Sequence, residues 1–252
     1  MRLALSLSLL LALSMAGTVT TSAQEKLSAI QILERMDTKI NGNEDQDMDV
    51  TLTVIDTDGS EKSYDFNIKQ KGNDKRLIRF NSGELKNMSI LTMNQDQVYI
   101  YLPGYKKVRR VASHNMSQSF VGSDFTNADM ATASFLEVYD PVLEKEDEAF
   151  WYLRLTPKPG KDTGYASLLT KVGKKDFLQW QSDFFDEKGT HVKRFAASQP
   201  KLFPGTTAEW HSHIELSDPR TGHKTTMKVN ALKLNQGLKK SMFTTRYLQW
   251  AK

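Results

Sequence analysis

The chain has no cysteine among its 252 residues. That absence excludes a disulfide framework and also a lipoprotein acylated on an N-terminal cysteine. The sequence also lacks a Gly-x-Ser-x-Gly nucleophile elbow and a glycine-rich phosphate-binding loop. Ser123 stands beside Asp124, but no histidine is placed by sequence to activate it, so we interpret Gly122-Ser123-Asp124 as a loop turn. Nucleophilic catalysis therefore has little support.

Long hydrophobic runs are scarce as well. Arg2 precedes an apolar stretch from Leu3 to Ala16, and small residues follow it as far as Ala23. The stretch is shorter than the roughly 20 residues that span a bilayer. This order of features predicts a cleaved secretory signal peptide over residues 1–23, with an uncleaved membrane anchor as the alternative. The length of the remaining segment, residues 24–252, suits one large all-β domain or two small ones.

Charge of one sign is not in large excess, since the formal net charge is +4. Basic residues are scattered apart from one cluster, formed by Lys106, Lys107, Arg109 and Arg110. A secreted chain rarely meets nucleic acid, so we expect no nucleic-acid partner. The cluster indicates a solvated patch, or one that meets anionic lipid headgroups or a protein partner.

What the sequence does have is a repeated strand-and-turn pattern. Apolar and polar residues alternate from Met48 to Val54 and again from Tyr64 to Ile68, with a hairpin signal at Asp56 to Gly59. Roughly ten such runs follow one another through short turns, which implies antiparallel pairing. A helix is expected before them, capped by Ser28 and ended by Gly42. These patterns predict one continuous, strongly curved antiparallel sheet.

Two segments interrupt the pattern. The first, Ser113 to Tyr139, is long and contains an expected helix over Asn127–Phe135 capped by Thr126. Long ordered insertions often have a function. The second is the C-terminal run KKSMFTTRYLQWAK, whose apolar side chains are expected to cover some apolar surface.

The run YLPGYKKVRRVASHNMSQSFVGSDFTNADM resembles the signature of outer-membrane lipoprotein-sorting proteins, the LolA-like family. The resemblance rests on Tyr101-Leu102-Pro103, Val108-Arg109-Arg110-Val111, Gly122-Ser123-Asp124-Phe125 and Asp129. The early helix containing ILERMD, the DTDG hairpin and the closing Phe243–Leu248 segment fit as well, so the resemblance covers essentially all of residues 24–252. One departure is Lys86, which is followed by Asn87 where relatives usually have glycine, and this puts a local turn in doubt.

The resemblance implies a mainly β (α+β) fold, in which about eleven antiparallel strands form a half-barrel with helices or a loop plugging its concave side. It also implies a periplasmic carrier in a Gram-negative bacterium that moves the acyl chains of lipoproteins, or lipids, towards the outer membrane. Relatives are often associated with inner-membrane exporters of the resistance-nodulation-division type, so an exporter and an outer-membrane acceptor are implied partners. No enzyme activity and no cofactor are expected, and we expect a monomer.

The one-sided strand pattern suggests which residues line the concavity. Our representative candidates for an acyl-chain cavity are Val50, Leu52, Tyr64, Phe66, Ile100 and Leu102. The alternative is a sealed core filled by aromatic side chains, among them Phe66, Tyr99, Tyr101, Trp151, Trp180, Phe184 and Trp210. A non-carrier adaptor subunit of an envelope complex, without a deep cavity, would have the same fold.

The adjacent residues Arg109 and Arg110 must point to opposite faces of a strand. We expect the inward one to pair with Asp124 or Asp129 in the insertion and hold it closed as a lid, because a buried arginine needs acceptors. The sequence does not decide which arginine faces inward. Both arginines could instead be ordinary strand residues whose charged ends reach water.

A metal-dependent β-barrel enzyme is the competing class. The run WHSHIEL places His211, His213 and Glu215 on one strand face, and two histidines with a carboxylate could ligate a transition metal. Alternation alone also produces a polar outer face of this kind, which is the interpretation we favour.

Overall fold

The computed structural model describes residues 26–93, 97–112, 115–131, 134–161, 163–207 and 209–250. The predicted signal peptide, residues 1–23, lies outside the described residues. Within these ranges, no helix is both long enough and apolar enough to cross a membrane.

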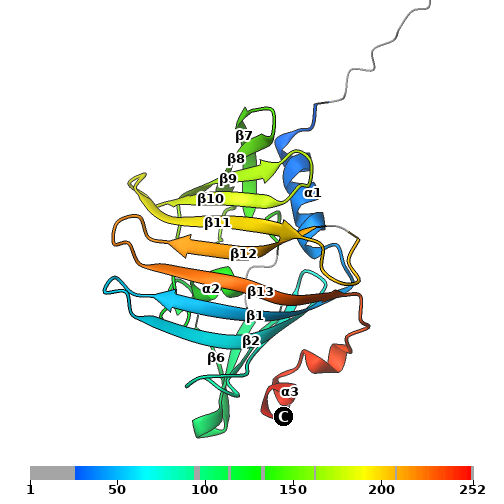
Figure 1. Cartoon of the computed structure of the whole chain (residues 1–252), viewed down its shortest axis with the longest axis vertical. Coiled ribbons are helices and arrows are strands. Elements are labelled where there is room, and N and C mark those ends of the chain that lie inside the picture. The colour runs from blue at the N-terminus through cyan, green and yellow to red at the C-terminus, as the bar shows by residue number, and fades with distance from the viewer. Residues whose placement is uncertain are drawn as a thin grey trace, which may run out of the picture.

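The described chain forms one antiparallel sheet that stays open at both edges, with the strand order β6-β5-β4-β3-β2-β1-β13-β12-β11-β10-β9-β8-β7 (Figure 1). This confirms the predicted half-barrel class, although thirteen strands are described rather than about eleven. The strands are β1 (Asp45–Ile55), β2 (Glu61–Lys71), β3 (Lys75–Phe80), β4 (Ser89–Met93), β5 (Gln97–Leu102), β6 (Lys107–Arg110), β7 (Tyr139–Glu146), β8 (Phe150–Pro157), β9 (Ser167–Gly173), β10 (Gln179–Phe185), β11 (His191–Lys201), β12 (Trp210–Ser217) and β13 (Lys224–Leu234).

Most neighbouring strands are consecutive in the chain because short turns join them. In the predicted DTDG turn, Gly59 has a φ of 83° and its N–H donates to the Asp56 carbonyl over 2.9 Å. Asn87 has a φ of 68°, so asparagine takes the left-handed conformation at the position where glycine was expected. The exception is the pair formed by β13 and β1, which are far apart in the chain. β13 follows β12 and lies between β12 and β1.

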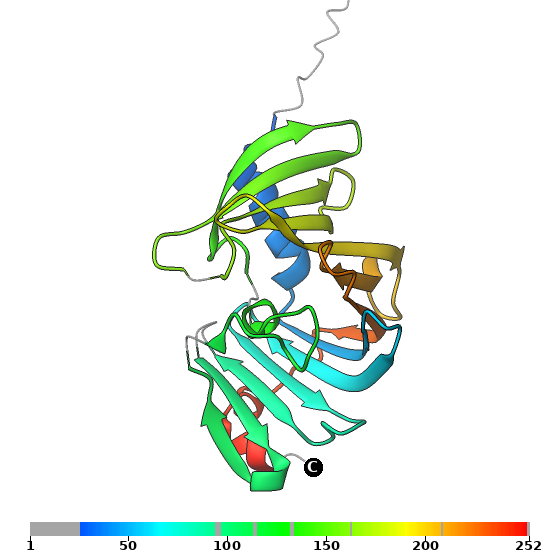
Figure 2. The ribbon, with the colours of Figure 1, turned by 90° about the vertical axis from the view of Figure 1, so that its left-hand side faces the viewer.

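Helix α1 (Ala29–Asn41) lies against the concave side of the sheet, which curves around it (Figure 2). Its start is a capping box, in which the Gln31 N–H donates to the Ser28 hydroxyl and the Ser28 N–H donates to the Gln31 side chain. Ile32, Leu33 and Met36 are fully buried against the inner side chains of β7 to β10. The predicted cap at Ser28 and the predicted end at Gly42 are confirmed.

The two faces of β3, β4 and β5 are covered by different parts of the chain. Ile78, Ile90 and Ile100 belong to the cluster on the concave side, while Leu77, Leu91 and their neighbours pack against the C-terminal segment. This segment contains a 3-10 turn (Lys240–Met242) and α3 (Thr245–Trp250). Its buried side chains Phe243 and Leu248 confirm that the closing run covers apolar surface.

Candidate functional site: a plugged apolar cavity

The long insertion between β6 and β7 packs into the concave side of the sheet (Figure 2). Its helix α2 (Asn127–Ala131) is capped by Thr126, whose hydroxyl accepts the Asp129 N–H over 3.0 Å. The helix ends at Ala131 rather than at Phe135, and residues 132 and 133 lie outside the described residues. Phe120, Phe125 and Met130 are buried among the inner side chains of β1 to β5. The insertion is therefore a plug rather than a surface loop.

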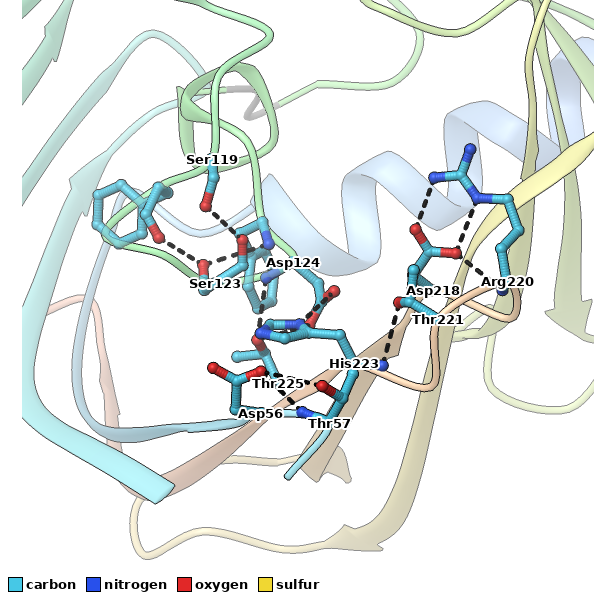
Figure 3. A network of polar contacts seen from close by, with 12 residues as sticks. Asp56, Thr57, Ser119, Ser123, Asp124, Asp218, Arg220, Thr221, His223 and Thr225 are labelled. Carbon is cyan, nitrogen blue, oxygen red and sulfur yellow. Dashed lines mark hydrogen bonds and ion pairs between the residues drawn. The ribbon is translucent and has the colours of Figure 1, made fainter. Parts of the chain in front are cut away.

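The first polar tie of this plug reaches β13 through Asp124 (Figure 3). The carboxylate of Asp124 accepts the Thr225 hydroxyl over 2.8 Å and lies 2.9 Å from the Nδ1 atom of His223. In return, the Asp124 N–H donates to the Thr225 hydroxyl over 2.9 Å. Ser123 closes the turn by donating its hydroxyl to the Phe120 carbonyl, as expected for a structural turn.

A second tie joins Asp129 in α2 to Lys193 in β11. The ammonium of Lys193 lies 2.7 Å from the Asp129 carboxylate, and the Lys193 side chain is buried. The same ammonium lies 4.8 Å from the centre of the Tyr165 ring and 5.3 Å from that of Phe184. A buried charge needs partners of this kind, so the ion pair anchors α2 over the middle of the sheet.

A third tie comes from Arg76 in β3. Arg76 donates to the Met130 carbonyl over 2.7 Å and to the Gln70 side chain over 2.8 Å. Burial lowers the pKa of Arg76 to about 10, which leaves its guanidinium charged at neutral pH.

Asp37, on the inner side of α1, holds the segment that follows α2. Its carboxylate accepts the Ser134 hydroxyl over 2.6 Å, the Phe135 N–H over 3.0 Å and the Leu136 N–H over 2.7 Å. Together with the first three ties, this contact fastens the insertion to β13, β11, β3 and α1.

Beside the plug lies a cavity of about 290 Å³, bounded by α1, α2 and the central strands. Its wall is mainly apolar and includes Met48, Ile68, Phe195, Ile214, Met227 and Val229. The apolar part of such a wall suits apolar ligands. The volume lies near the lower limit of ordinary ligand pockets, which are roughly 300–1,000 Å³.

Polar side chains occupy parts of the same wall. They are Gln46, Gln70, Arg76, Asp129, Tyr139, Gln179 and His211. Burial raises the pKa of the Tyr139 phenol, so it stays protonated at neutral pH. Burial also lowers the pKa of His211, against weaker opposing effects from Asp176 and nearby backbone, and favours the neutral imidazole. The wall of the cavity therefore combines a mainly apolar surface with a few polar groups.

The six predicted lining residues lie on the correct face but not in the wall of this cavity. Val50, Leu52, Tyr64 and Phe66 are buried in the core cluster that the plug completes, and Ile100 and Leu102 pack against that cluster. The centres of the Phe80 and Phe120 rings are 6.0 Å apart, which shows how the insertion fills this region. Met48 and Ile68, which pair with each other further along the same strands, line the cavity instead.

The predicted arginine latch has the wrong partners. Arg109 and Arg110 are both exposed, and neither contacts Asp124 or Asp129 within the described part of the chain. The register places Arg109 opposite Ile100 and Arg110 opposite Tyr99, so Arg109 is the one on the concave face. The strand that carries them, β6, is an edge strand, and five strands separate it from β13. The two aspartates do tie down the insertion, but His223, Thr225 and Lys193 are their partners.

The predicted metal set is not assembled. Among the described residues, no group of three or more His, Asp or Glu side chains could hold a metal ion. The ring nitrogens of His211 are shielded from solvent and make no well-formed hydrogen bond, and the ring packs at 4.6 Å against Trp180. His213 lies between Ser198 and Lys228 in the sheet. Glu215 lies 3.7 Å from Lys224 in an ion pair.

Three residues of the site were not identified from the sequence, although each leaves a signal there. Arg76 alternates with Ile78 and Phe80 and therefore shares their buried face, and Lys193 shares the face of Phe195 in the same way. Asp37 follows Leu33 by four positions and so lies on the apolar stripe of α1. A charged residue at an apolar position of an element was the signal in all three cases.

Comparison with known proteins supports the fold. A family model described as an uncharacterized protein matches residues 72–250. A DUF1329 family protein from Desulfovibrio piger is 24% identical, with a TM-score of 0.80 over 87% of this chain and 97% of that one. No curated protein matches this sequence.

Two further solved structures are named for lipoprotein sorting. A Vibrio parahaemolyticus protein, provisionally described as an outer membrane lipoprotein-sorting protein domain, is 20% identical, with a TM-score of 0.78 over 88% of this chain and 98% of that one. A LolA superfamily protein from Nitrosomonas europaea is 21% identical, with a TM-score of 0.74 over 88% of this chain and all of that one (100%). At these identities the likeness establishes the fold, which is LolA-like.

Proposed function

The chain belongs to the family, described as an uncharacterized protein, whose model matches residues 72–250, and from its LolA-like fold we propose that it is a periplasmic carrier of acyl chains. The acyl chains belong to lipoproteins or free lipids, and the carrier moves them towards the outer membrane. An inner-membrane exporter of the resistance-nodulation-division type would supply the cargo. The proposal also includes cleavage of residues 1–23 and function as a monomer.

The single observation that carries the proposal is the apolar cavity beside the plug. Each methylene group moved from water into such a wall contributes about 0.8 kcal/mol, so an acyl chain of ordinary length gains several kcal/mol before the costs of ordering. No reactive group is needed for this work. Entry of a long chain requires more room than about 290 Å³, and movement of the plug past its polar ties would provide it.

Ala197 offers a direct test because it is buried and lies in the cavity wall. Ala197→Phe fills the cavity and should weaken binding of a fluorescent fatty-acid probe at least tenfold, the equivalent of about 1.4 kcal/mol. The neighbouring variant Ala196→Phe is the matched control, since its side chain points to the other face of β11. Equal probe binding by both variants would place the ligand elsewhere.

Lipid extraction from the purified protein identifies the cargo. We expect co-purified acyl chains in the wild type and a clear depletion in Ala197→Phe. If the wild type carries no lipid and binds no probe, the protein is an adaptor with a closed core rather than a carrier.

A further inference from the structure

The hairpin formed by β5 and β6 ends the sheet at one edge (Figure 2). Its tip is a 3-10 turn over Pro103–Tyr105, and Lys106 follows it in the left-handed conformation with a φ of 51°. The turn leaves the Tyr105 side chain 71% exposed. An aromatic residue with a hydroxyl group, held out at a hairpin tip, suits a boundary between water and apolar material.

Positive charge is concentrated around this tip. Lys106, Lys107, Arg109 and Arg110 are all exposed, and none forms an ion pair with another described residue. No acidic residue occurs in β3, β4, β5 or β6, or in the turn and helix of the C-terminal segment. Asp96, the nearest acid in sequence, lies outside the described residues. Within the part of the chain that the structure describes, the charge of this edge is therefore not balanced locally.

The C-terminal segment adds to the same edge. It packs against β4, β5 and β6, and its exposed basic residues are Lys239, Lys240 and Arg246. In Figure 1 this segment and the β6 hairpin lie together at the lower end of the molecule. Two parts of the chain that are far apart in sequence thus supply cations to one edge.

The opposite edge strand, β7, is different. It is acidic, but Glu144 pairs with Arg154 at 2.9 Å, and Glu146 pairs with Lys26 at 2.6 Å and Lys174 at 2.8 Å. These contacts pair Glu144 and Glu146 with cations, whereas no ion pair involves the four cations of the β6 hairpin within the described residues. A formal net charge of +4 therefore underestimates the field at the β6 edge.

The position of the cations indicates the kind of surface they meet. Arg109 lies on the concave face and Arg110 on the face of the C-terminal segment, so positive charge surrounds the protruding hairpin. A broad, flat, anionic surface can meet such an edge from either side, and exposed lysines suit mobile phosphate headgroups better than a fixed groove. Tyr105 at the tip fits the headgroup level of a bilayer, where tyrosine is enriched.

We propose that the β5–β6 hairpin docks the protein on the surface of bilayers that contain anionic phospholipids. The four cations of the hairpin contact the phosphates, and Tyr105 enters the headgroup layer. None of the hairpin cations takes part in the polar ties of the plug described above, and the inference stands whether or not the cavity binds acyl chains.

Sedimentation with lipid vesicles tests the proposal. The purified protein should bind vesicles of phosphatidylglycerol and phosphatidylcholine but not vesicles of phosphatidylcholine alone, and binding should weaken as added salt shortens the Debye length from about 30 Å at 0.01 M to about 8 Å at 0.15 M. Replacing Lys106, Lys107, Arg109 and Arg110 by glutamine should weaken binding by roughly a hundredfold or more, at about fivefold for each cation. Tyr105→Ala should cause a further loss that salt does not reproduce.

The matched control removes the same number of charges elsewhere. Lys62, Lys161, Lys188 and Lys233 are all exposed, and their replacement by glutamine gives a protein of equal net charge. We expect this control to keep most of the binding. Equal loss in both quadruple variants, or unchanged binding in the hairpin variant, would overturn the proposal.

Failure of the wild type to prefer anionic vesicles would overturn it as well, and an acidic protein would then be the better partner for this edge. The result is separable from the carrier function, because a soluble fatty-acid probe reports on the cavity without any vesicle. The hairpin variant should bind that probe like the wild type, and this also shows that it is folded.

Discussion

At the scale of single residues, the charged groups buried under the insertion matter most. Asp37 and Lys193 are buried, and each occupies a position that the pattern of its element assigns to the core. They are kept there because each has defined partners, as a buried charge requires. The site is therefore built from charged side chains that lie on otherwise apolar faces of their elements.

Asp37 gives a sharp test of this point. Asp37→Ala removes three hydrogen bonds to residues 134–136 and should lower the free energy of unfolding by about 2–3 kcal/mol. Glu34→Ala, on the exposed side of the same helix, should change it by less than about 0.5 kcal/mol. Chemical denaturation measures both, and equal values for the two variants would contradict the role given to Asp37.

His211 makes a prediction about pH. Burial lowers the pKa of His211 in the folded protein, so below its unfolded pKa of about 6.5 the unfolded state binds more protons than the folded state. The free energy of unfolding is therefore not reduced by His211 above that pKa, and it decreases as the pH falls below that pKa.

His211→Phe keeps an aromatic ring against Trp180 and removes the titrating group. Its free energy of unfolding should fall less than that of the wild type between about pH 7 and pH 5. Urea denaturation across this range gives the comparison. Parallel curves for the two proteins would show that His211 is hydrated in the folded state.

At the scale of elements, the insertion is held by contacts that no local sequence pattern predicts. The DTDG turn and helix α1 form from nearby residues, and both were predicted from the sequence. The ties of the insertion join residues up to 101 positions apart, as in the pair of Asp124 and Thr225. The predicted arginine latch is wrong for this reason, since it pairs Arg109 or Arg110 with carboxylates that are near in sequence rather than across the sheet.

Lys193→Met should loosen the insertion. The substitution leaves the Asp129 carboxylate without its cation, which should cost about 3 kcal/mol and accelerate amide hydrogen exchange across residues 115–131. Lys171→Met is the control, because Lys171 packs over Phe150 on the other face of the sheet. Faster exchange in both variants, or in α1 as much as in the insertion, would argue for general destabilisation.

At the scale of the whole molecule, β13 is the central strand that joins the two halves of the sheet. It pairs with β1 on one side and β12 on the other, so the strands before the insertion and those after it form one body. Lys228, in the middle of β13, is exposed and lies opposite Thr51 and His213. Because the Lys228 side chain is exposed, a change of the backbone at this position tests whether the two halves of the sheet unfold together rather than how side chains pack.

Lys228→Pro should lower the free energy of unfolding by at least about 3 kcal/mol, since proline cannot donate to a ladder in a central strand. Arg110→Pro, in edge strand β6, should cost much less, because the Val111 N–H donates to the Val98 carbonyl and the alternation of the ladder leaves the Arg110 N–H on the open edge of the sheet. Tryptophan fluorescence and far-ultraviolet circular dichroism should give one coincident transition for the wild type. Separate transitions for the two halves would contradict the single body.

The sequence by itself determined the elements and their order, because strand alternation, turn residues and helix caps act over a few positions. It therefore predicted one curved antiparallel sheet and α1, and it identified the correct face of β1 and β2, while the half-barrel and its plug were implied by the resemblance to the LolA-like family. Only the tertiary structure decided where the plug ends and the cavity begins, so Met48 and Ile68 line the cavity while Val50 and Phe66 are covered. That boundary depends on Asp124, Asp129, Lys193 and Arg76 meeting across the sheet, and such meetings follow from strand order and register, which no short stretch of sequence contains.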